Sequence, residues 1–175
     1  MNTVIEQMMS RRSVRKYKAD PVPQELLDQV IQAGTYAASG KGHQAGLIVA
    51  VTNRELRDKL SEMNRQIGGW EKGFDPFYGA PVVLAVLAEK AWPTHVYDGS
   101  LVMGNLMLAA HSLGLGSCWI HRARETFETP EGKQILKDLG VEGEYEGIGY
   151  CILGYADGAL PPAPARKEHF VYYAK

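Results

Sequence analysis

Hydrophobic residues recur along the chain in patterns typical of both helices and strands. Apolar side chains at helical spacing predict helices over residues 1–12, 23–33, 98–113 and 130–139, and one more after Asn53. Short apolar runs, several of them β-branched, predict strands over residues 44–52, 82–88, 117–120 and 147–155. Because the two kinds of element interleave, the pattern predicts a central sheet covered by helices.

Two apolar features exceed what one small domain needs. The helix predicted over residues 98–113 is apolar around most of its circumference, so it must be covered on nearly every side. After the proline-containing stretch 159–165, residues 170–173 form a strand-like apolar run that would be an aggregation hazard if left exposed. Both features predict a homodimer, with this tail paired to the partner's sheet edge. The alternative is a tail that folds back on its own chain.

Length and charge narrow the function. The chain has 175 residues, which is enough for one domain with a hydrophobic core. Its formal net charge of −1 is too small for the overall field of the protein to attract nucleic acid or anionic lipid. No apolar run approaches the length of a membrane span, and no signal-like segment opens the chain. Cys118 and Cys151 match no metal or CxxC spacing. We expect buried thiols in a cytoplasmic protein without a metal site.

Several common catalytic motifs are missing. No GxGxxG follows a predicted strand, and no Walker A, HExxH or GxSxG sequence occurs. The sequence therefore does not support a Rossmann dinucleotide site, a P-loop, a zinc protease or a serine hydrolase. An aromatic, glycine-rich loop over residues 68–79 is a candidate pocket wall or lid.

A basic segment near the N-terminus carries the clearest chemistry. Residues 11–17 read RRSVRKY, which places four cations and a hydroxyl close together. Guanidinium groups with a hydroxyl donor suit a phosphate, although a solvated basic turn has the same composition. A second basic pair, Arg166 and Lys167, follows the proline stretch.

The order of several segments resembles the FMN-dependent nitroreductase family. The matching segments are RRSVRKY, ASGKGHQ, YGAPVVLAV, YDGSLVMGNLMLAAHSLGLGSCWI and GIGYCILGY, followed by the late basic pair. The resemblance implies an α+β fold, with a mixed central sheet flanked by helices. It also implies a homodimer with two FMN sites at the interface and C-terminal strands exchanged between subunits. Residues 1–158 would form the FMN-binding domain and residues 159–175 its C-terminal arm.

The resemblance assigns roles at the phosphate end of FMN. Arg11, Arg12 and Ser13 correspond to residues that contact the phosphate and the ribityl chain. Arg166 corresponds to a late phosphate-binding arginine, and Lys167 assists it.

Other roles concern the flavin ring. Arg15 corresponds to the basic residue near the N1 and O2 edge, where a cation stabilises the negative charge of reduced FMN. The backbone N–H groups of His121 and Arg122 would meet flavin N5 and O4. Asn64 would contact the pyrimidine edge.

One loop departs from the family pattern. Ser39 and Gln44 match the family residues that reach the flavin from the second subunit. Gly42 replaces the usual asparagine, and Ala45 with Gly46 replaces a Pro-Trp pair. The side-chain contacts of that asparagine are therefore absent, and the backbone of Gly42 is the candidate substitute.

The implied activity is a hydride relay. An FMN-dependent oxidoreductase would pass hydride from NADH or NADPH through flavin N5 to a small electron-poor acceptor, such as a nitroaromatic or a quinone, in a ping-pong reaction. No side chain is needed as a catalytic acid. Two alternatives are a reductive dehalogenase of halogenated tyrosine, with Glu71 and Lys72 as possible zwitterion contacts, and a non-catalytic flavin carrier.

Overall fold

A computed structural model describes residues 1–175 and shows an α+β domain, as predicted. Its elements are α1 (Thr3–Ser10), α2 (Gln24–Thr35), the 3₁₀ turn η1 (Gly40–Gly42), β1 (Gly46–Val51), α3 (Arg54–Gly68), β2 (Val82–Glu89), α4 (His95–Ser112), β3 (Gly116–Ile120), α5 (Ala123–Glu128), α6 (Pro130–Asp138) and β4 (Tyr145–Gly154). The short helix α5 was not predicted, because six residues are too few to display an apolar stripe.

The sheet has the strand order β1-β2-β4-β3, and every neighbouring pair is antiparallel. The expectation of a mixed sheet is corrected here, because the parallel pairing is confined to an isolated bridge between Ser13 and Ser117. The β2–β4 register shifts between Val86 and Leu87, which leaves Ile148 of β4 without a partner. This β-bulge lies where α4 and α5 approach the sheet.

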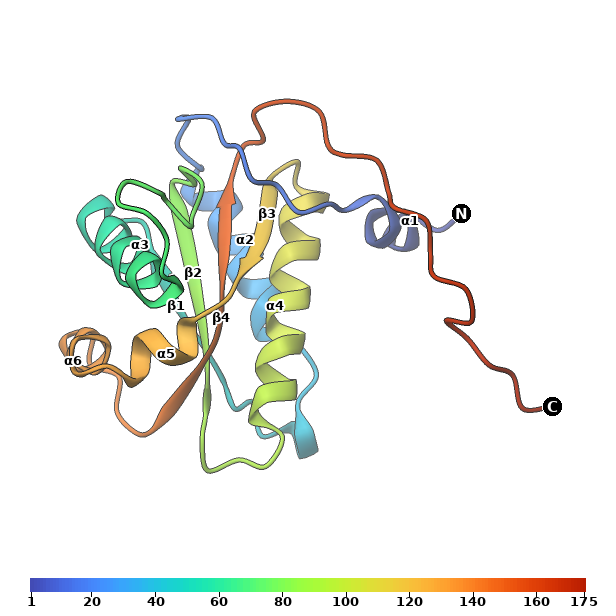
Figure 1. The fold of residues 1–175 in the computed structure, drawn as a ribbon. Coiled ribbons are helices and arrows are strands. Elements are labelled where there is room, and N and C mark those ends of the chain that lie inside the picture. The colour runs from blue at the N-terminus through green and yellow to red at the C-terminus, as the bar shows by residue number, and fades with distance from the viewer.

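Two helical layers cover the two faces of the sheet (Figure 1). Alternate residues of β2, such as Val83 and Leu87, enter a core shared with α3, α5 and α6. Their neighbours Leu84 and Val86 enter the core formed with α2 and α4. Since β2 is buried on both faces, its sequence is a continuous apolar run rather than an alternating one.

Close helix–sheet contact depends on two glycines. A Cβ on Gly99 of α4 would lie 2.5 Å from the side chain of Ile148, and a Cβ on Gly147 would lie 2.3 Å from the backbone of Ala123. Neither distance leaves room for a side chain, so α4 and α5 can approach β4 this closely only over glycine.

The two cysteines are buried free thiols, as predicted. They lie in the two different cores, Cys118 under α3 and Cys151 under α4, so they cannot bridge each other. Burial raises the pKa of Cys151 to about 12, which keeps it protonated and unreactive.

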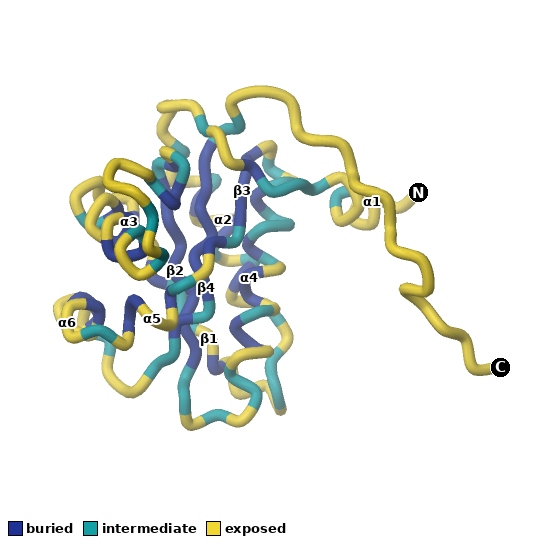
Figure 2. Tube along the Cα trace, viewed as in Figure 1, coloured by how far each residue is buried: buried dark blue, intermediate teal, exposed yellow.

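Both chain ends project from the body (Figure 2). Helix α1 buries none of its residues, and every residue from 157 to 175 is exposed. The tail does not fold back on its own chain, and residues 170–173 form no strand within it. On α4, Val102 and Leu106 are buried but Leu101 is 50% exposed. No helix is long and apolar enough to span a membrane.

Candidate functional site

The basic segment lies along the free edge of β3. After α1 ends at Ser10, the backbone of Ser13 forms its parallel bridge with Ser117, and the amide of Val14 donates to the carbonyl of Ser117 at 2.9 Å. This pairing fixes Arg11 and Arg12 beside the start of the strand. The basic segment and the GLGSCWI strand are therefore joined by a backbone contact.

Three buried polar atoms at this edge have no hydrogen-bond partner. They are Nη1 of Arg11, Nε of Arg12 and Oγ of Ser117. Arg12 uses its Nη1 for the carbonyls of Met9 and Arg11, at 2.8 and 2.6 Å. A buried donor without an acceptor costs about 1–3 kcal/mol, more when it is charged. The edge therefore has spare donors for an anionic ligand.

His111, from the last turn of α4, belongs to the same region. Its Nε2 lies 2.9 Å from Oγ of Ser10, and it lines a cavity of about 170 Å³ with Arg12 and Ser117. Burial, followed by the charges of Arg11 and Arg12, lowers the pKa of His111 below its ordinary value. The imidazole is therefore neutral near pH 7 and adds no further positive charge.

The turn between β3 and α5 exposes two backbone donors. Neither the N–H of His121 nor that of Arg122 donates a hydrogen bond within the chain. Arg122 has φ 76°, a left-handed conformation that costs a non-glycine residue about 1 kcal/mol or more. Its carbonyl accepts from the amide of Thr126 at 2.9 Å, in the first turn of α5, and from Oγ1 of Thr126 at 2.7 Å.

Helix α3 contacts this turn through the side chain of Asn64. Asn64 is fully buried, and its Nδ2 donates to the carbonyl of His121 at 2.7 Å. Its Oδ1 is buried without a partner. The guanidinium of Arg122 lies over the Trp70 ring, 4.4 Å from the centroid, in cation–π geometry. Asn64 thus positions the turn and keeps one free acceptor.

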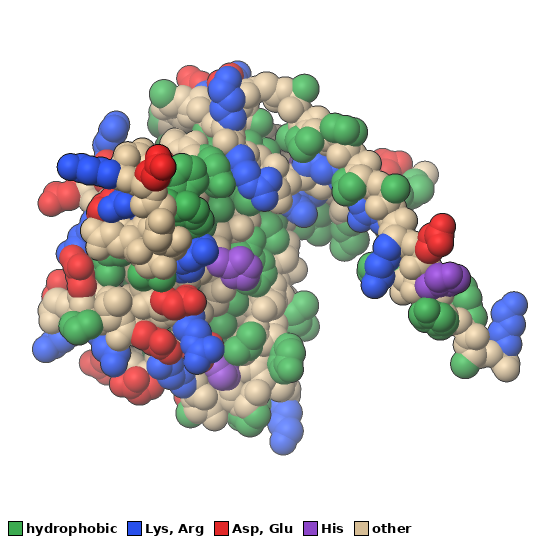
Figure 3. Space-filling view, in the orientation of Figure 1, with side chains coloured by type: hydrophobic (Ala, Val, Ile, Leu, Met, Phe, Trp, Pro, Cys, Tyr) green, Lys and Arg blue, Asp and Glu red, His purple; other side chains and the backbone are tan.

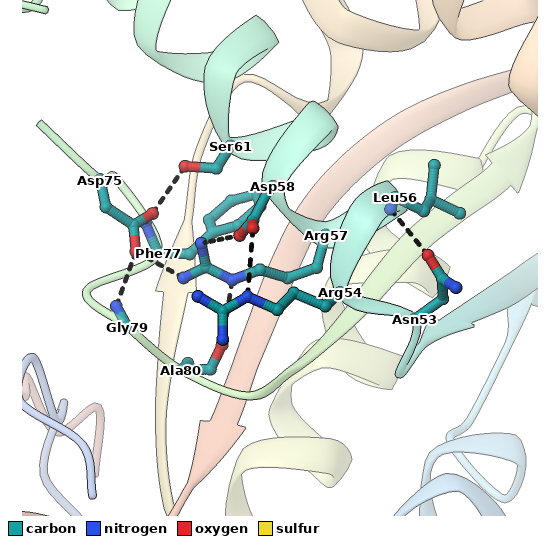
Figure 4. Close-up of polar contacts among 10 residues, drawn as sticks. All are labelled: Asn53, Arg54, Leu56, Arg57, Asp58, Ser61, Asp75, Phe77, Gly79 and Ala80. Atoms are coloured by element: carbon teal, nitrogen blue, oxygen red, sulfur yellow. Dashed lines mark hydrogen bonds and ion pairs between the residues drawn. The ribbon is translucent and has the colours of Figure 1, made fainter. Parts of the chain in front are cut away.

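The loop that carries Trp70 is tied back to α3 by a partly buried ionic cluster (Figure 4). Asp75 accepts from Nη2 of Arg57 at 2.5 Å, from Oγ of Ser61 at 2.6 Å and from the amides of Phe77 and Gly79 at 2.9 and 2.7 Å. Burial raises the pKa of Asp75, but these hydrogen bonds together lower it below the ordinary carboxyl value. Asp75 is therefore a carboxylate that anchors the aromatic loop.

Ser39 and Gln44 lie at a different place on the body. Oγ of Ser39 accepts from the amide of Gln44 at 2.9 Å, and the buried carboxylate of Asp98 accepts from the amide of Gly40 at 3.0 Å. Ser39 and Gln44 line a cavity of about 300 Å³ between α2, α4 and β1. Gln44 has φ 57°, so this loop too is held in a strained conformation.

A single chain does not bring all the predicted site residues together. Arg15 is exposed beside a cavity of about 300 Å³ that Ser13 also lines. Arg166 and Lys167 lie on the projecting arm, where Nη2 of Arg166 donates to the carbonyl of Pro164 at 2.7 Å and Lys167 lies over Phe170. The β3 edge and its following turn are thus continuous, whereas the Ser39 loop and the arm lie apart from them.

The chain matches a known family over most of its length. Residues 8–155 match the model described as the Nitroreductase family. The chain belongs to this family. The family model thus ends at the close of β4, and the exposed arm lies outside it.

Individual relatives agree with this membership. A crystal structure of a nitroreductase with bound FMN from Bacteroides fragilis is 29% identical, with a TM-score of 0.89 and full coverage of both chains. An NADPH-flavin oxidoreductase of Vibrio harveyi is 30% identical over 183 residues, covering 99% of this chain and 74% of the relative. An iodotyrosine deiodinase of Thermotoga neapolitana is 25% identical over 191 residues, covering 99% and 98%.

Sequence reasoning missed three residues of this candidate site. Ser117 and His111 lie in segments that matched the family, yet a serine in a strand and a histidine in a helix carry no signal of their own. Trp70 was recognised only as part of an aromatic loop. Its pairing with Arg122 depends on the path of that loop around α3, which periodicity does not reveal.

Proposed function

We propose that this nitroreductase-family protein binds FMN along the β3 edge and transfers hydride from NADH or NADPH to a small electron-poor acceptor. The observation that carries the proposal is a set of unpartnered donors along one edge. Arg11, Arg12 and Ser117 supply them at one end, and the free amides of His121 and Arg122 supply them at the other. FMN needs donors at both places, for its phosphate and for its ring edge.

Each donor has a distinct task in this proposal. Arg11 and Arg12 bind the phosphate with Ser13, and Ser117 gives its hydroxyl to the same end. The amides of His121 and Arg122 face N5 and O4, while the free Oδ1 of Asn64 suits the N–H of the pyrimidine edge.

When bound, FMN supplies the ring nitrogen N5, which accepts a hydride and passes it on. The chain's part is to orient the ring, to hold a positive charge from Arg15 near N1, and to keep donors directed at N5 and O4. Since the chain has no separate dinucleotide motif, we propose that donor and acceptor use the same ring face in turn.

We also propose that the active form is a homodimer. The exposed apolar side chains include Val4, Ile5, Met8 and Met9 of α1, Tyr97 and Leu101 of α4, and Phe170, Val171, Tyr172 and Tyr173 of the arm. Figure 3 shows hydrophobic side chains along the projecting arm, well away from the body. So many large apolar side chains exposed on three segments are typical of subunit interfaces rather than of monomers.

A dimer also explains the separated site residues. The arm of one chain would bring Arg166 and Lys167 to a phosphate site, and the Ser39 loop would approach the partner's flavin ring with Gln44. Gly104 supports this arrangement, because a Cβ there would meet nothing within 4 Å and the outer face of α4 stays open to a second backbone. We assign the protein to the cytoplasm, where its two free thiols would stay reduced.

The proposal is tested on the purified protein. We expect it to carry FMN, released by heating, and to be reduced anaerobically by NADH or NADPH in stopped-flow absorbance measurements. Reoxidation is then followed with nitroaromatics, quinones and 3-iodotyrosine. A protein that cannot be loaded with FMN contradicts the proposal. Bound FMN that neither nicotinamide reduces indicates a carrier, and preferred turnover of 3-iodotyrosine indicates a dehalogenase.

Arg11→Ala is expected to weaken FMN binding by about 10- to 100-fold, because a charge-assisted hydrogen bond contributes roughly 1.5–3 kcal/mol. Fluorescence titration of the flavin-free protein measures the change. Lys18→Ala, an exposed cation beyond the segment, serves as the control and should bind FMN normally. Riboflavin should bind the unmutated protein much more weakly than FMN. Equal affinities for the two flavins would show that Arg11 does not bind the phosphate.

A further inference from the structure

Arg122 occupies a backbone conformation that its side chain disfavours. Its φ of 76° lies in the left-handed region, which glycine adopts freely and residues with a Cβ adopt rarely. The turn it forms carries the two free amides that the proposed function directs at the flavin. Something in the structure must therefore hold Arg122 in place.

Two side-chain contacts restrain the turn, one at His121 and one at Arg122. The Asn64 side chain fixes the carbonyl of His121 at 2.7 Å, which sets the entry to the turn. The guanidinium of Arg122 lies 4.4 Å from the centroid of the Trp70 ring, which sets the direction in which the side chain leaves the backbone. The second contact acts on the side chain of the strained residue, whose carbonyl also accepts from the amide and Oγ1 of Thr126.

Trp70 can restrain Arg122 because contacts with α3 fix the position of Trp70 independently. Its carbonyl accepts from Nη1 of Arg65 at 2.5 Å, and its amide donates to the carbonyl of Arg65 at 3.2 Å. A Cβ on Gly68 would lie 2.5 Å from the indole, so the ring rests directly on the backbone of α3. Further along the loop, Asp75 is clamped by Arg57 and Ser61.

We propose that Trp70 is a positioning residue for the flavin. By stacking with the Arg122 guanidinium, it holds Arg122 in the left-handed conformation and so aims the turn amides at N5 and O4. This inference rests on the proposed function of the turn. An N–H directed at N5 withdraws electron density from the atom that accepts the hydride, so its direction affects the rate of flavin reduction.

Two single substitutions disturb the stack in different ways. Trp70→Ala removes the ring, whereas Gly68→Ala keeps the ring but displaces it from α3. Both should slow single-turnover reduction of bound FMN by NADH about tenfold, and both should leave the phosphate end of the site intact. The control is Glu55→Gln, an exposed substitution at the opposite end of α3. FMN bound to this variant should be reduced at the same rate as in the unmutated protein.

A double variant separates positioning from direct contact. Glycine adopts the left-handed conformation without support, so Trp70→Ala should have no further effect on the reduction rate when Arg122→Gly is already present. In the flavin-free protein, Trp70→Ala should speed hydrogen exchange at residues 121–123, whereas Glu55→Gln should not. This second measurement does not depend on catalysis.

Three results would overturn the inference. One is an effect of Trp70→Ala on the reduction rate that is equally large whether or not Arg122→Gly is present, since Trp70 would then act on the flavin or the acceptor directly. Another is an unchanged reduction rate in both Trp70→Ala and Gly68→Ala with FMN fully bound, which leaves the proposed function standing. The third is unchanged hydrogen exchange at the turn. Failure of the unmutated protein to bind FMN would instead remove the proposed function, and the exchange comparison would still test whether Trp70 supports the turn.

Discussion

Truncation after Lys167 is expected to convert the proposed homodimer to a monomer of nearly the 19.3 kDa chain mass and to abolish the proposed tight binding of FMN. The truncated chain keeps Arg166 and Lys167 but loses the exposed apolar residues 170–173 that would anchor the arm on the partner. Without that anchor, two charge-assisted contacts to the phosphate lose their position, so FMN affinity should fall by at least about a hundredfold. Sedimentation and flavin titration measure the two effects.

The matched control removes only Ala174 and Lys175, which leaves the apolar run intact and should leave both properties unchanged. Thermal stability of the full chain should rise with protein concentration, as expected for a dimer, and that dependence should vanish on truncation. A truncated protein that stays dimeric and fully loaded with FMN would rule out the exchanged arm. An unmutated monomer that binds FMN tightly would rule out the interface site altogether.

Arg57→Ala is expected to lower the free energy of unfolding by about 2–3 kcal/mol, or roughly 4–12 °C in melting temperature. The substitution leaves Asp75 without the partner that compensates its burial. The estimate is below that for a fully buried pair because the Asp75 side chain is 33% exposed. Arg54→Ala is the matched control on the same helix. Arg54 is 93% exposed and 3.5 Å from Asp58, so its loss should cost less than about 1 kcal/mol.

The same cluster predicts a pH dependence. Because the pKa of Asp75 is lower in the folded protein than its ordinary value, its carboxylate stabilises the fold above that ordinary value. The contribution is lost as the pH falls through the lowered folded pKa. The unmutated protein should therefore be more stable than Asp75→Asn at neutral pH, and the difference should shrink in acid. Denaturant unfolding of the FMN-free protein across that pH range measures it. A constant difference would show that Asp75 acts through shape rather than charge.

The sequence was sufficient for the family, the fold class and most elements. Strands such as β2 are continuous apolar runs, and helices such as α3 combine an apolar stripe with an Asn53 cap whose side chain accepts from the amide of Leu56. The pattern of apolar residues does not reveal whether neighbouring strands run parallel or antiparallel. Residues 13–17 run along the sheet edge but form only isolated bridges, so the single chain contains no mixed sheet.

The site was harder to derive because its geometry depends on contacts between distant segments. Asn64 is predicted to contact the flavin, and its Oδ1 remains free to do so, but its amide nitrogen also holds the carbonyl of His121, a role that the sequence did not indicate. The sequence indicated a role for the backbone N–H of Arg122. A role for its side chain becomes apparent only from the contact with Trp70 in the structure. Such pairings are set by how α3 packs against α5, and no spacing along the chain encodes them.

The surplus residue of β4 has a consequence for how this strand can change length. Ile148 has no partner in β2 and packs beside Gly99, while Gly147 faces the backbone of Ala123 on the other side of the sheet. Ile148 and its neighbour Gly149 both face the α4 side, so deleting Ile148 alone would restore regular pairing and leave Gly147 and Tyr145 facing the core on the α5 side. A one-residue deletion in a regularly paired part of the strand would instead exchange the faces of the residues beyond it. Related sequences that lack the bulge should therefore be one residue shorter at this point of the strand.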